Sequence, residues 1–335
     1  MIRGVNLGGW LVLEKWITPS LFQNTSARDE YTLCEALGAS ADATLKQHRD
    51  SFITEDDFRW IAEHGLDAVR LPVGYWIFDG DAPYIAGIEY VDKAFEWAAR
   101  YRLGIVLDLH GATGSQNGNE HSGRTGDIAW NAPENRAKSL HTIERLAERY
   151  KGNDQLIGIE LLNEPSWLNK RRVLREYYEH GYDIIRKHCG TNVAVIAADA
   201  FHPKKWGRVM QGAQYQAKWL DVHLYQLFNK RDKKLSIGGH IDKTNQAWRS
   251  LLAKVSKRWP IMVGEWSIAL DPQTFKNMDT ATTHAAYRAY GSVQLQVFEA
   301  HAASWFYWTY KTQNGGAWSY RDCVANGWLP ATYSN

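Results

Sequence analysis

Short apolar runs rich in Val, Ile and Leu alternate along the chain with longer amphipathic stretches. We distinguish eight such runs, over residues 2–7, 68–71, 104–109, 156–162, 193–197, 219–224, 261–264 and 303–308. Each run has the length of a strand and is nearly continuous in apolar character, so burial on both faces is expected. The pattern therefore predicts a sheet of parallel strands with helices between them.

The stretches between the runs carry helical periodicity. From residue 90 to residue 102, apolar side chains recur every three or four positions, which predicts one buried stripe along a helix. Thr54 followed by Asp57 resembles a capping box and predicts a helix that runs to about Glu63, with Gly65 just past its end. Further helices are expected over 135–150, 171–188, 245–258 and 282–301, with a less regular one over 204–215.

Eight strand–helix units favour closure of the sheet into a (β/α)8 TIM barrel. The main alternative is a doubly wound open sheet, but no Gly-x-Gly-x-x-Gly motif opens a helix after the first strand and no Walker lysine is present. No repeat, low-complexity segment or Pro/Gly/Ser-rich linker divides the chain. We therefore expect residues 1–335 to form a single barrel domain, with its functional side chains at the C-terminal ends of the strands.

Composition and charge exclude several classes of function. The chain has 39 basic and 37 acidic residues, so its net charge of +2 gives no electrostatic reason to expect nucleic acid or an anionic membrane as partner. No run is long enough to span a membrane, and Met1 leads almost directly into the first apolar run, so we expect that any secretion signal is absent or was removed. Cys34, Cys189 and Cys323 are widely spaced, which argues against a disulfide framework or a zinc site. The 16 Trp residues, nearly as many as the 17 Tyr, are unusual and need a place in the structure.

Two carboxylates stand out because each ends an apolar run. Glu164 lies in Leu-Leu-Asn-Glu-Pro and Glu265 in Val-Gly-Glu-Trp. Cleavage of a glycosidic bond requires a proton for the leaving oxygen and a negative charge beneath an oxocarbenium-like centre, and two glutamates in different environments provide both. Either glutamate alone could instead cap a helix or form a salt bridge at the barrel rim.

The excess of Trp fits a sugar ligand, because a pyranose presents apolar C–H faces on which aromatic rings can pack. For most of the Trp residues we expect packing in the core. Trp308 is the exception, because it lies at the end of the last predicted strand, where contact with a ligand is expected.

An ordered set of segments carries a resemblance to a known family. The segments are Arg-Gly-Val-Asn-Leu-Gly-Gly-Trp at 3–10, Leu-Asp-Leu-His-Gly at 107–111, Gly-Ser-Gln-Asn-Gly at 114–118, Leu-Leu-Asn-Glu-Pro at 161–165, His-Leu-Tyr-Gln-Leu-Phe at 223–228, Gly-Glu-Trp-Ser at 264–267 and Phe-Tyr-Trp-Thr at 306–309. Together they span nearly the whole chain. In these segments the sequence resembles glycoside hydrolase family 5, and most closely its fungal-type exo-β-1,3-glucanases.

The resemblance implies roles for particular residues. Glu164 would be the general acid/base and Glu265 the nucleophile of a retaining double displacement, which predicts carboxyl groups roughly 5 to 5.5 Å apart. Arg70 and Tyr225 would bond to Glu265 and keep it ionised, whereas Glu164 must be protonated when the substrate complex forms. The remaining substrate-binding residues would be Glu14, His110, Asn163, His223, Phe228 and Trp308. No cofactor and no metal ion is implied.

The predicted activity is a retaining β-glucanase that hydrolyses β-1,3-glucan, with transglycosylation as a side reaction. Alternatives within the same class are a β-1,6-glucanase and a β-glucosidase that acts on a glucoside with an apolar aglycone. A different class is a non-catalytic glucan-binding barrel, which would not require Arg70, Asn163 and Tyr225 around two glutamates. We expect a monomer whose partner is a β-glucan or β-glucoside, and this substrate class favours a secreted or cell-surface setting.

One position departs from the family pattern. The fungal exo-enzymes that the sequence resembles carry an aromatic residue directly after Gly-Ser-Gln-Asn-Gly, where it clamps the acceptor sugar together with the residue matching Phe228. This chain has Asn119 at that position. The exo mode of cleavage is therefore open, and an endo-acting enzyme is the alternative.

Overall fold

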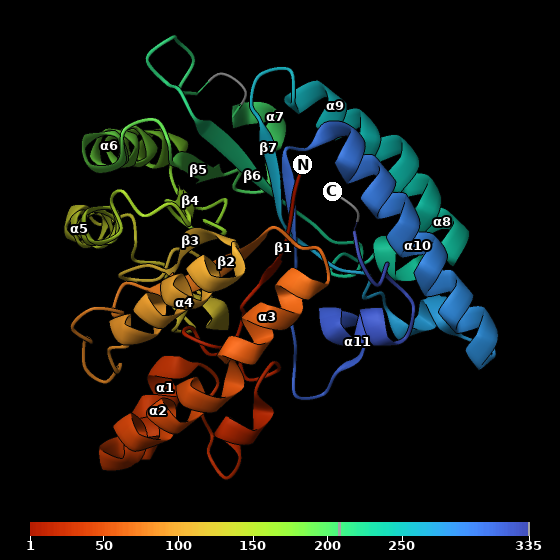
Figure 1. The fold of residues 1–335 in the computed structure, drawn as a ribbon, viewed down its shortest axis with the longest axis horizontal. Helices are drawn as coiled ribbons and strands as arrows, with labels where there is room; N and C mark the ends of the chain where they lie inside the picture. The colour runs from red at the N-terminus through yellow and green to blue at the C-terminus, as the bar shows by residue number, and fades with distance from the viewer. Residues whose placement is uncertain (207–208, 334–335) are drawn as a thin grey trace.

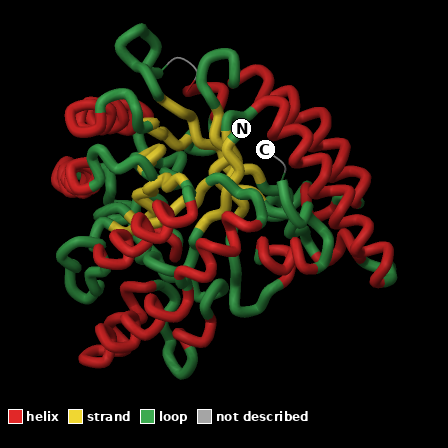
Figure 2. Tube along the Cα trace, in the orientation of Figure 1, coloured by secondary structure: helices red, strands yellow, loops and turns green. Residues whose placement is uncertain are grey.

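The computed structural model describes residues 1–206 and 209–333, in which eight parallel strands form a closed barrel. The strands pair in chain order, and the last pairs with the first. They are β1 (Ile2–Asn6), β2 (Ala68–Gly74), β3 (Gly104–Gly111), β4 (Leu156–Glu160), β5 (Ala194–Ala198), β6 (Lys218–Leu224), β7 (Ile261–Trp266) and β8 (Ser304–Tyr307). Figure 2 shows the strands at the centre with helices around them. The predicted TIM barrel is confirmed, and every strand begins within one residue of its predicted start.

Helices cover the outside of the barrel (Figure 1), and all but one, over 320–325, overlap or adjoin a predicted helix. They are α3 (Glu55–Glu63), α4 (Ile88–Tyr101), α5 (Pro133–Arg149), α6 (Arg171–Cys189), α7 (Pro203–Trp206), α8 (Ile237–Lys243), α9 (Arg249–Val255), α10 (Thr280–His301) and α11 (Tyr320–Ala325). A π-helical turn, Thr244–Trp248, joins α8 to α9, so the helix predicted over 245–258 begins earlier in the structure. Within the stretch predicted over 204–215, only the residues of α7 are helical, and residues 207–208 lie outside the described part.

Local sequence signals explain where the helices begin and which face they bury. The backbone N–H of Thr54 donates to the Asp57 carboxylate at 2.9 Å, which confirms the predicted capping box of α3. On α4 the buried side chains include Val91, Ala94 and Phe95, members of the predicted stripe. The apolar periodicity of these segments therefore marks the faces that pack against the barrel.

Two helices between β1 and β2 were not predicted. They are α1 (Glu30–Leu37) and α2 (Ala41–Phe52), which lie at one end of the view in Figure 1. A small separate core that includes Leu13, Phe22 and Leu33 lies between them and the loop after β1. Their own signal is a capping box in which the Asp29 carboxylate accepts from the N–H of Thr32. These helices extend the rim of the barrel beside the loop that carries Glu14.

The barrel interior is layered, because alternate residues of each strand point inward and positions two apart lie above one another. Near the N-terminal ends of the strands the layer is apolar, with Ala68, Val106, Ala194, Ile196, Met262 and Phe306. Arg70, Asp108 and Asp221 belong to the next layer and are fully buried, as is Glu160. Two residues farther along β3 and β6 come His110 and His223, at the mouth. The strands thus carry their side chains from an apolar base through a charged layer to the site.

Two further observations concern the rest of the chain. In the described ranges, no helix combines the length and apolar character needed to cross a bilayer. The three cysteines are free thiols: Cys34 and Cys323 are buried and Cys189 is half-buried.

Candidate active site

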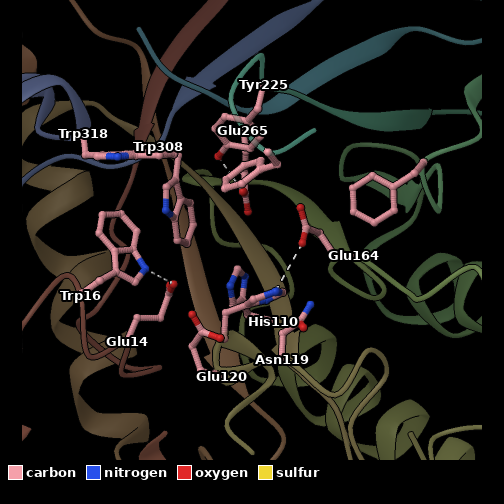
Figure 3. A pocket seen from close by; sticks show the side chains of 13 residues that line it. Glu14, Trp16, His110, Asn119, Glu120, Glu164, Tyr225, Glu265, Trp308 and Trp318 are labelled. Atoms are coloured by element: carbon pink, nitrogen blue, oxygen red, sulfur yellow. Dashed lines mark hydrogen bonds and ion pairs between the residues drawn. The ribbon is translucent and has the colours of Figure 1, made fainter. Parts of the chain in front are cut away.

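A cavity of about 620 Å³ lies at the C-terminal mouth of the barrel (Figure 3). Its walls combine carboxylates, imidazoles and aromatic rings: Glu14, Trp16, His110, Asn119, Glu120, His121, Glu164, Phe201, Tyr225, Phe228, Glu265, Trp308 and Trp318. Seven of the ten residues predicted for the site therefore line one cavity. The other three are not among the lining residues but contact lining side chains: Arg70 contacts Glu265, Asn163 contacts His110 and His223 contacts Glu164. Its size is within the usual range for sites that bind small molecules.

The two glutamates face each other across His223. An oxygen of Glu164, a nitrogen of His223 and an oxygen of Glu265 all lie within 4.8 Å of one another. His223 Nδ1 is 2.6 Å from Glu164 Oε1 and 3.4 Å from Glu265 Oε2. Carboxylates that cleave with inversion lie roughly 6.5 to 9.5 Å apart, so this spacing belongs to the shorter, retaining class.

Glu265 is held by two donors. The Tyr225 hydroxyl donates to Glu265 Oε2 at 2.9 Å, and Arg70 Nη1 lies 3.3 Å from Oε1. Arg70 is itself fixed because it donates to Asn6 Oδ1 at 2.9 Å and to Asn163 Oδ1 at 2.8 Å. The carboxylate of Glu265 therefore has a defined orientation at the end of β7.

Burial is the largest influence on the pKa values of Glu164, Glu265 and His223, and it favours the neutral form of each side chain. For Glu164 the hydrogen bond and charge of His223 outweigh burial and lower the pKa to about 2. For Glu265 burial prevails over the charge of His223 and raises the pKa to about 7. The charges of Glu265 and Asp221 overcome burial at His223 and raise its pKa well above the ordinary value.

These directions favour the proton on His223 over the proton on Glu164. The sequence-based expectation, Glu164 protonated and Glu265 ionised, concerns the substrate complex, and the carboxyl pKa values here have the opposite order. The reason is geometric, since His223 is nearer to Glu164 than to Glu265. Carboxylates this close titrate as a coupled pair, so movement of one proton changes the state of both.

His110 and Trp308 form a flat wall beside the glutamates. Their rings stack at a centroid distance of 5.3 Å with an interplanar angle of 5°. Asp108 Oδ2 lies 2.7 Å from His110 Nδ1, and burial lowers the pKa of His110 to about 4, so the ring is neutral at physiological pH. The Asn163 amide nitrogen lies 3.5 Å from the other ring nitrogen, Nε2. This wall therefore offers an apolar face together with polar edges.

Glu14 lies on the opposite side of the cavity from Glu164, next to Trp16 (Figure 3). Trp16 Nε1 donates to Glu14 Oε2 at 2.8 Å, whereas Oε1 is buried and has no hydrogen-bond partner in the described chain. Burial raises the pKa of Glu14 well above its ordinary value, although the Trp16 hydrogen bond opposes this. A buried oxygen without a partner in a cavity wall is suited to accept a ligand hydroxyl.

Two aromatic side chains project at the cavity entrance. Phe228 is 69% exposed and Phe201 is 53% exposed, although large apolar side chains in water are unfavourable unless a ligand covers them. Tyr225 packs edge-on against Phe228 at a centroid distance of 5.3 Å. Asn119 also lines the cavity. An amide therefore stands in the cavity wall at the position after Gly-Ser-Gln-Asn-Gly, where the family pattern has an aromatic ring.

Five lining residues escaped the sequence-based prediction: Trp16, Glu120, His121, Phe201 and Trp318. They lie in the connections that follow the strands, three of them in single 3-10 turns, where neither strand nor α-helix periodicity predicts the direction of a side chain. His121 is the most consequential, because its Nε2 lies 3.4 Å from Glu164 Oε2. Its only sequence signal is its position shortly after the Gly-Ser-Gln-Asn-Gly segment.

Most of the Trp residues other than Trp308 are buried in the core. Trp10, Trp76, Trp130 and Trp266 are fully buried. The expectation that core packing takes most of them is therefore confirmed.

Among the described residues, ligand-type side chains gather in two groups, each with its ligand atoms within 4.8 Å of one another: Glu160 with Asp221 and His223, and Glu164 with His223 and Glu265. Both groups use His223, whose nitrogens lie 2.6 Å from Glu164 and 2.9 Å from Asp221. The two groups are therefore joined by hydrogen bonds through one imidazole.

Comparison with known families decides the wider assignment. The model of the cellulase family, glycosyl hydrolase family 5, matches residues 35–314. The chain belongs to glycosyl hydrolase family 5. The predicted family is thus confirmed, and with it the prediction that the protein is a glycoside hydrolase.

Two fungal relatives align with nearly the whole length of this family 5 chain. It is 38% identical to a probable glucan 1,3-β-glucosidase A of Emericella nidulans, over 98% of this chain and 90% of that protein. It is 36% identical to a glucan 1,3-β-glucosidase of Blumeria graminis, over 98% and 86% respectively. The rutinosidase of Aspergillus niger has the same fold, with a TM-score of 0.83, 22% identity and 97% coverage of each chain.

Proposed function

We propose that this family 5 hydrolase cleaves β-1,3-linked glucan with retention of anomeric configuration, with Glu164 as acid/base and Glu265 as nucleophile. The observation that carries the proposal is the pair of carboxylates with oxygens within 4.8 Å, set in a cavity with aromatic walls. The glucan 1,3-β-glucosidases that share 36–38% of its residues support the choice of linkage.

The chemistry follows from the positions of the two carboxylates. Glu265 attacks the anomeric carbon while Glu164 gives a proton to the departing glycosidic oxygen, so a glycosyl ester forms and an alcohol leaves. Glu164, now a carboxylate, then takes a proton from the water that hydrolyses the ester. Tyr225 and Arg70 hold the Glu265 oxygens in place for the attack.

The sugar that is cleaved would lie between Glu14 and Glu164. In that position the free Oε1 of Glu14 accepts from its hydroxyls, and Trp308 packs against one face. Trp16 and Trp318, whose ring centroids are 5.2 Å apart, form the cavity wall on the same side as Glu14. This wall supports removal of one glucose at a time from a chain end.

A time course on a soluble β-1,3-glucan tests the proposal, with NMR of the first-formed anomer and sizing of the products. We expect the β-anomer first and glucose as the first product. Glu265→Ala should abolish turnover while oligosaccharide binding stays measurable by calorimetry. An α-anomer as first product would refute the retaining mechanism, and substantial activity of Glu265→Ala would refute the nucleophile assignment.

A second candidate substrate is a β-glucoside with an apolar aglycone, which the exposed rings of Phe201 and Phe228 favour. The same rings could hold a second sugar, in which case transglycosylation accompanies hydrolysis. Comparison of kcat/KM for laminaribiose with that for an alkyl glucoside separates the two candidates. Higher values for the alkyl glucoside would favour the glucosidase.

We further propose that residues 1–335 act as one monomeric domain, because one barrel closes on itself and carries the cavity at its mouth. Light scattering after gel filtration should give a mass near 38.3 kDa. A stable dimer mass would refute this assignment.

A further inference from the structure

A line of buried hydrogen-bonding groups continues beneath the acid/base. His223 Nε2 lies 2.9 Å from Asp221 Oδ2, and His223 Nδ1 lies 2.6 Å from Glu164 Oε1. The side chains of Asp221 and His223 are 0% and 4% exposed, so water does not compete for these contacts. Both nitrogens of one imidazole are therefore engaged by carboxylates, one at the reaction centre and one below it.

We propose that Asp221 is a positioning residue that fixes the tautomer and charge of His223, and so makes His223 the proton store of Glu164. The proposal rests on the proposed function, in which Glu164 is the acid/base. Asp221 belongs to the charged layer below the cavity and would act through His223 without touching the substrate.

The position of Asp221 is fixed from two sides. Its Oδ1 accepts from the backbone N–H of Gly264 at 2.7 Å. A side chain at Gly264 would leave no room for this contact, because a Cβ there would lie 2.3 Å from Asp221 Oδ1. The remaining oxygen, Oδ2, is thereby directed at His223 Nε2 and accepts its proton. A carboxylate bonded to one nitrogen of a histidine decides which tautomer the neutral ring adopts.

Among the described carboxylates, Glu164 is nearer to His223 Nδ1, at 2.6 Å, than Glu265, at 3.4 Å. When Nδ1–H of the imidazolium gives its proton to Glu164 Oε1, the N–H bond breaks and an O–H bond forms. The products are a neutral carboxylic acid and a neutral imidazole that keeps its Nε2–H on Asp221. No proton enters from water and the net charge is unchanged. The reverse transfer recharges His223 after Glu164 has taken a proton from the hydrolytic water.

The charges around His223 stabilise its protonated, imidazolium form. Ionisable groups face His223 from four strands and from the segments that follow three strands. Asp221, Arg70, Glu160 and Glu265 lie in β6, β2, β4 and β7, and Tyr225, Glu164 and Asp199 follow β6, β4 and β5. Burial raises the pKa of Glu160 well above its ordinary range in spite of the charge of Arg70. The carboxylates of Asp221 and Glu265 then outweigh the single cation Arg70, which lies 3.9 Å from Asp221.

Asp221→Asn tests the inference with two aryl glucosides, because an excellent leaving group departs without an acid and a poor one does not. The amide keeps an oxygen for Gly264 but removes the negative charge that holds the His223 proton. We expect kcat/KM to fall about 100-fold for phenyl β-glucoside, within the range of acid catalysis, and little for dinitrophenyl β-glucoside. The basic limb of the pH profile should move to lower pH. Equal losses on both substrates with an unmoved basic limb would overturn the inference.

Asp108→Asn is the matched control. It removes another buried carboxylate that contacts Arg70, at 3.0 Å, but it has no contact with His223. Any loss in this variant should be equal for the two glucosides. A steeper dependence on the leaving group in Asp108→Asn, as large as in Asp221→Asn, would show that general loss of charge is responsible and would overturn the inference.

Nitrogen NMR of labelled histidine in the unmodified enzyme keeps the inference testable if Asp221→Asn does not fold. His223→Asn identifies the resonance. We expect both nitrogens of His223 to be protonated at neutral pH, and a neutral ring protonated on Nδ1 would overturn the inference. Failure of the proposed function looks different, because the unmodified enzyme would then hydrolyse neither glucoside.

Discussion

Tyr225→Phe should shift the acid limb of the pH–activity profile to higher pH. The Tyr225 hydroxyl donates to Glu265 Oε2 at 2.9 Å in a buried site, so it stabilises the ionised carboxylate over the protonated one. Removing this donor leaves the ionised form less stable and must raise the pKa of Glu265. Burial already raises that pKa to about 7 in the intact site.

The expected size of the shift follows from the hydrogen bond. A hydrogen bond to a charged group contributes about 1.5 to 3 kcal/mol, and one pKa unit corresponds to about 1.36 kcal/mol. The acid limb should therefore move up by roughly one to two pH units. Below the original limb kcat/KM falls about 10- to 100-fold, whereas above the shifted limb the loss is smaller.

The assay is kcat/KM for an aryl β-glucoside measured across the pH range in which the enzyme stays folded. Tyr177→Phe is the control, because the Tyr177 hydroxyl is also buried but donates to the backbone carbonyl of Leu161 at 2.8 Å, away from the site. It should lower the free energy of unfolding by about 1 kcal/mol and leave the acid limb in place. A uniform loss of activity in Tyr225→Phe at every pH, with the limb unmoved, would refute the electrostatic role.

Three further predictions concern other parts of the molecule. Glu164→Ala should still form the glycosyl enzyme from a glucoside with a good leaving group, and azide should restore turnover; no rescue would count against the acid/base assignment. Asn119→Phe should lower KM for oligosaccharides about 3- to 10-fold, because a further ring in the cavity wall adds about 0.5 to 1.5 kcal/mol of contact, and an effect equal to that of Asn119→Ala would contradict this. Burial raises the pKa of Glu30 from 4.5 to about 7, so the unfolded state loses this proton first and stability falls as pH rises through that window. Urea denaturation of Glu30→Gln should show a flatter fall there, and an unchanged slope would contradict the assignment.

The barrel could be predicted from the sequence because each strand is buried on both faces and therefore appears as an apolar run. The helices α1 and α2 could not, because their buried apolar side chains pack mainly on a small local core and α2 carries many charged residues. Their beginning was nevertheless marked by the capping residues Asp29 and Thr32. Periodicity thus identifies elements that pack on the main core better than those that pack on each other.

For the site, the residues at strand ends were accessible to prediction because the barrel brings all eight ends to one face. His121 and Phe201 were not, because loop conformation decides whether they enter the cavity. Asp221 and Glu160 were overlooked for a different reason. A single charged residue inside an apolar run is a visible signal of a buried polar network, but only the register between strands shows which charges meet.

Asn6 has a consequence for how the protein comes to be active. Its side-chain nitrogen donates to the carbonyl of Gly264 at 2.8 Å and contacts the carbonyl of Phe306, 300 positions along the chain, while its oxygen accepts from Arg70. The support beneath Glu265 therefore exists only after the first strand has met the last two. Contacts between such distant residues form late, because a long loop must close first. In a refolding experiment the return of turnover would then report barrel closure, whereas helix content would recover earlier and report only collapse.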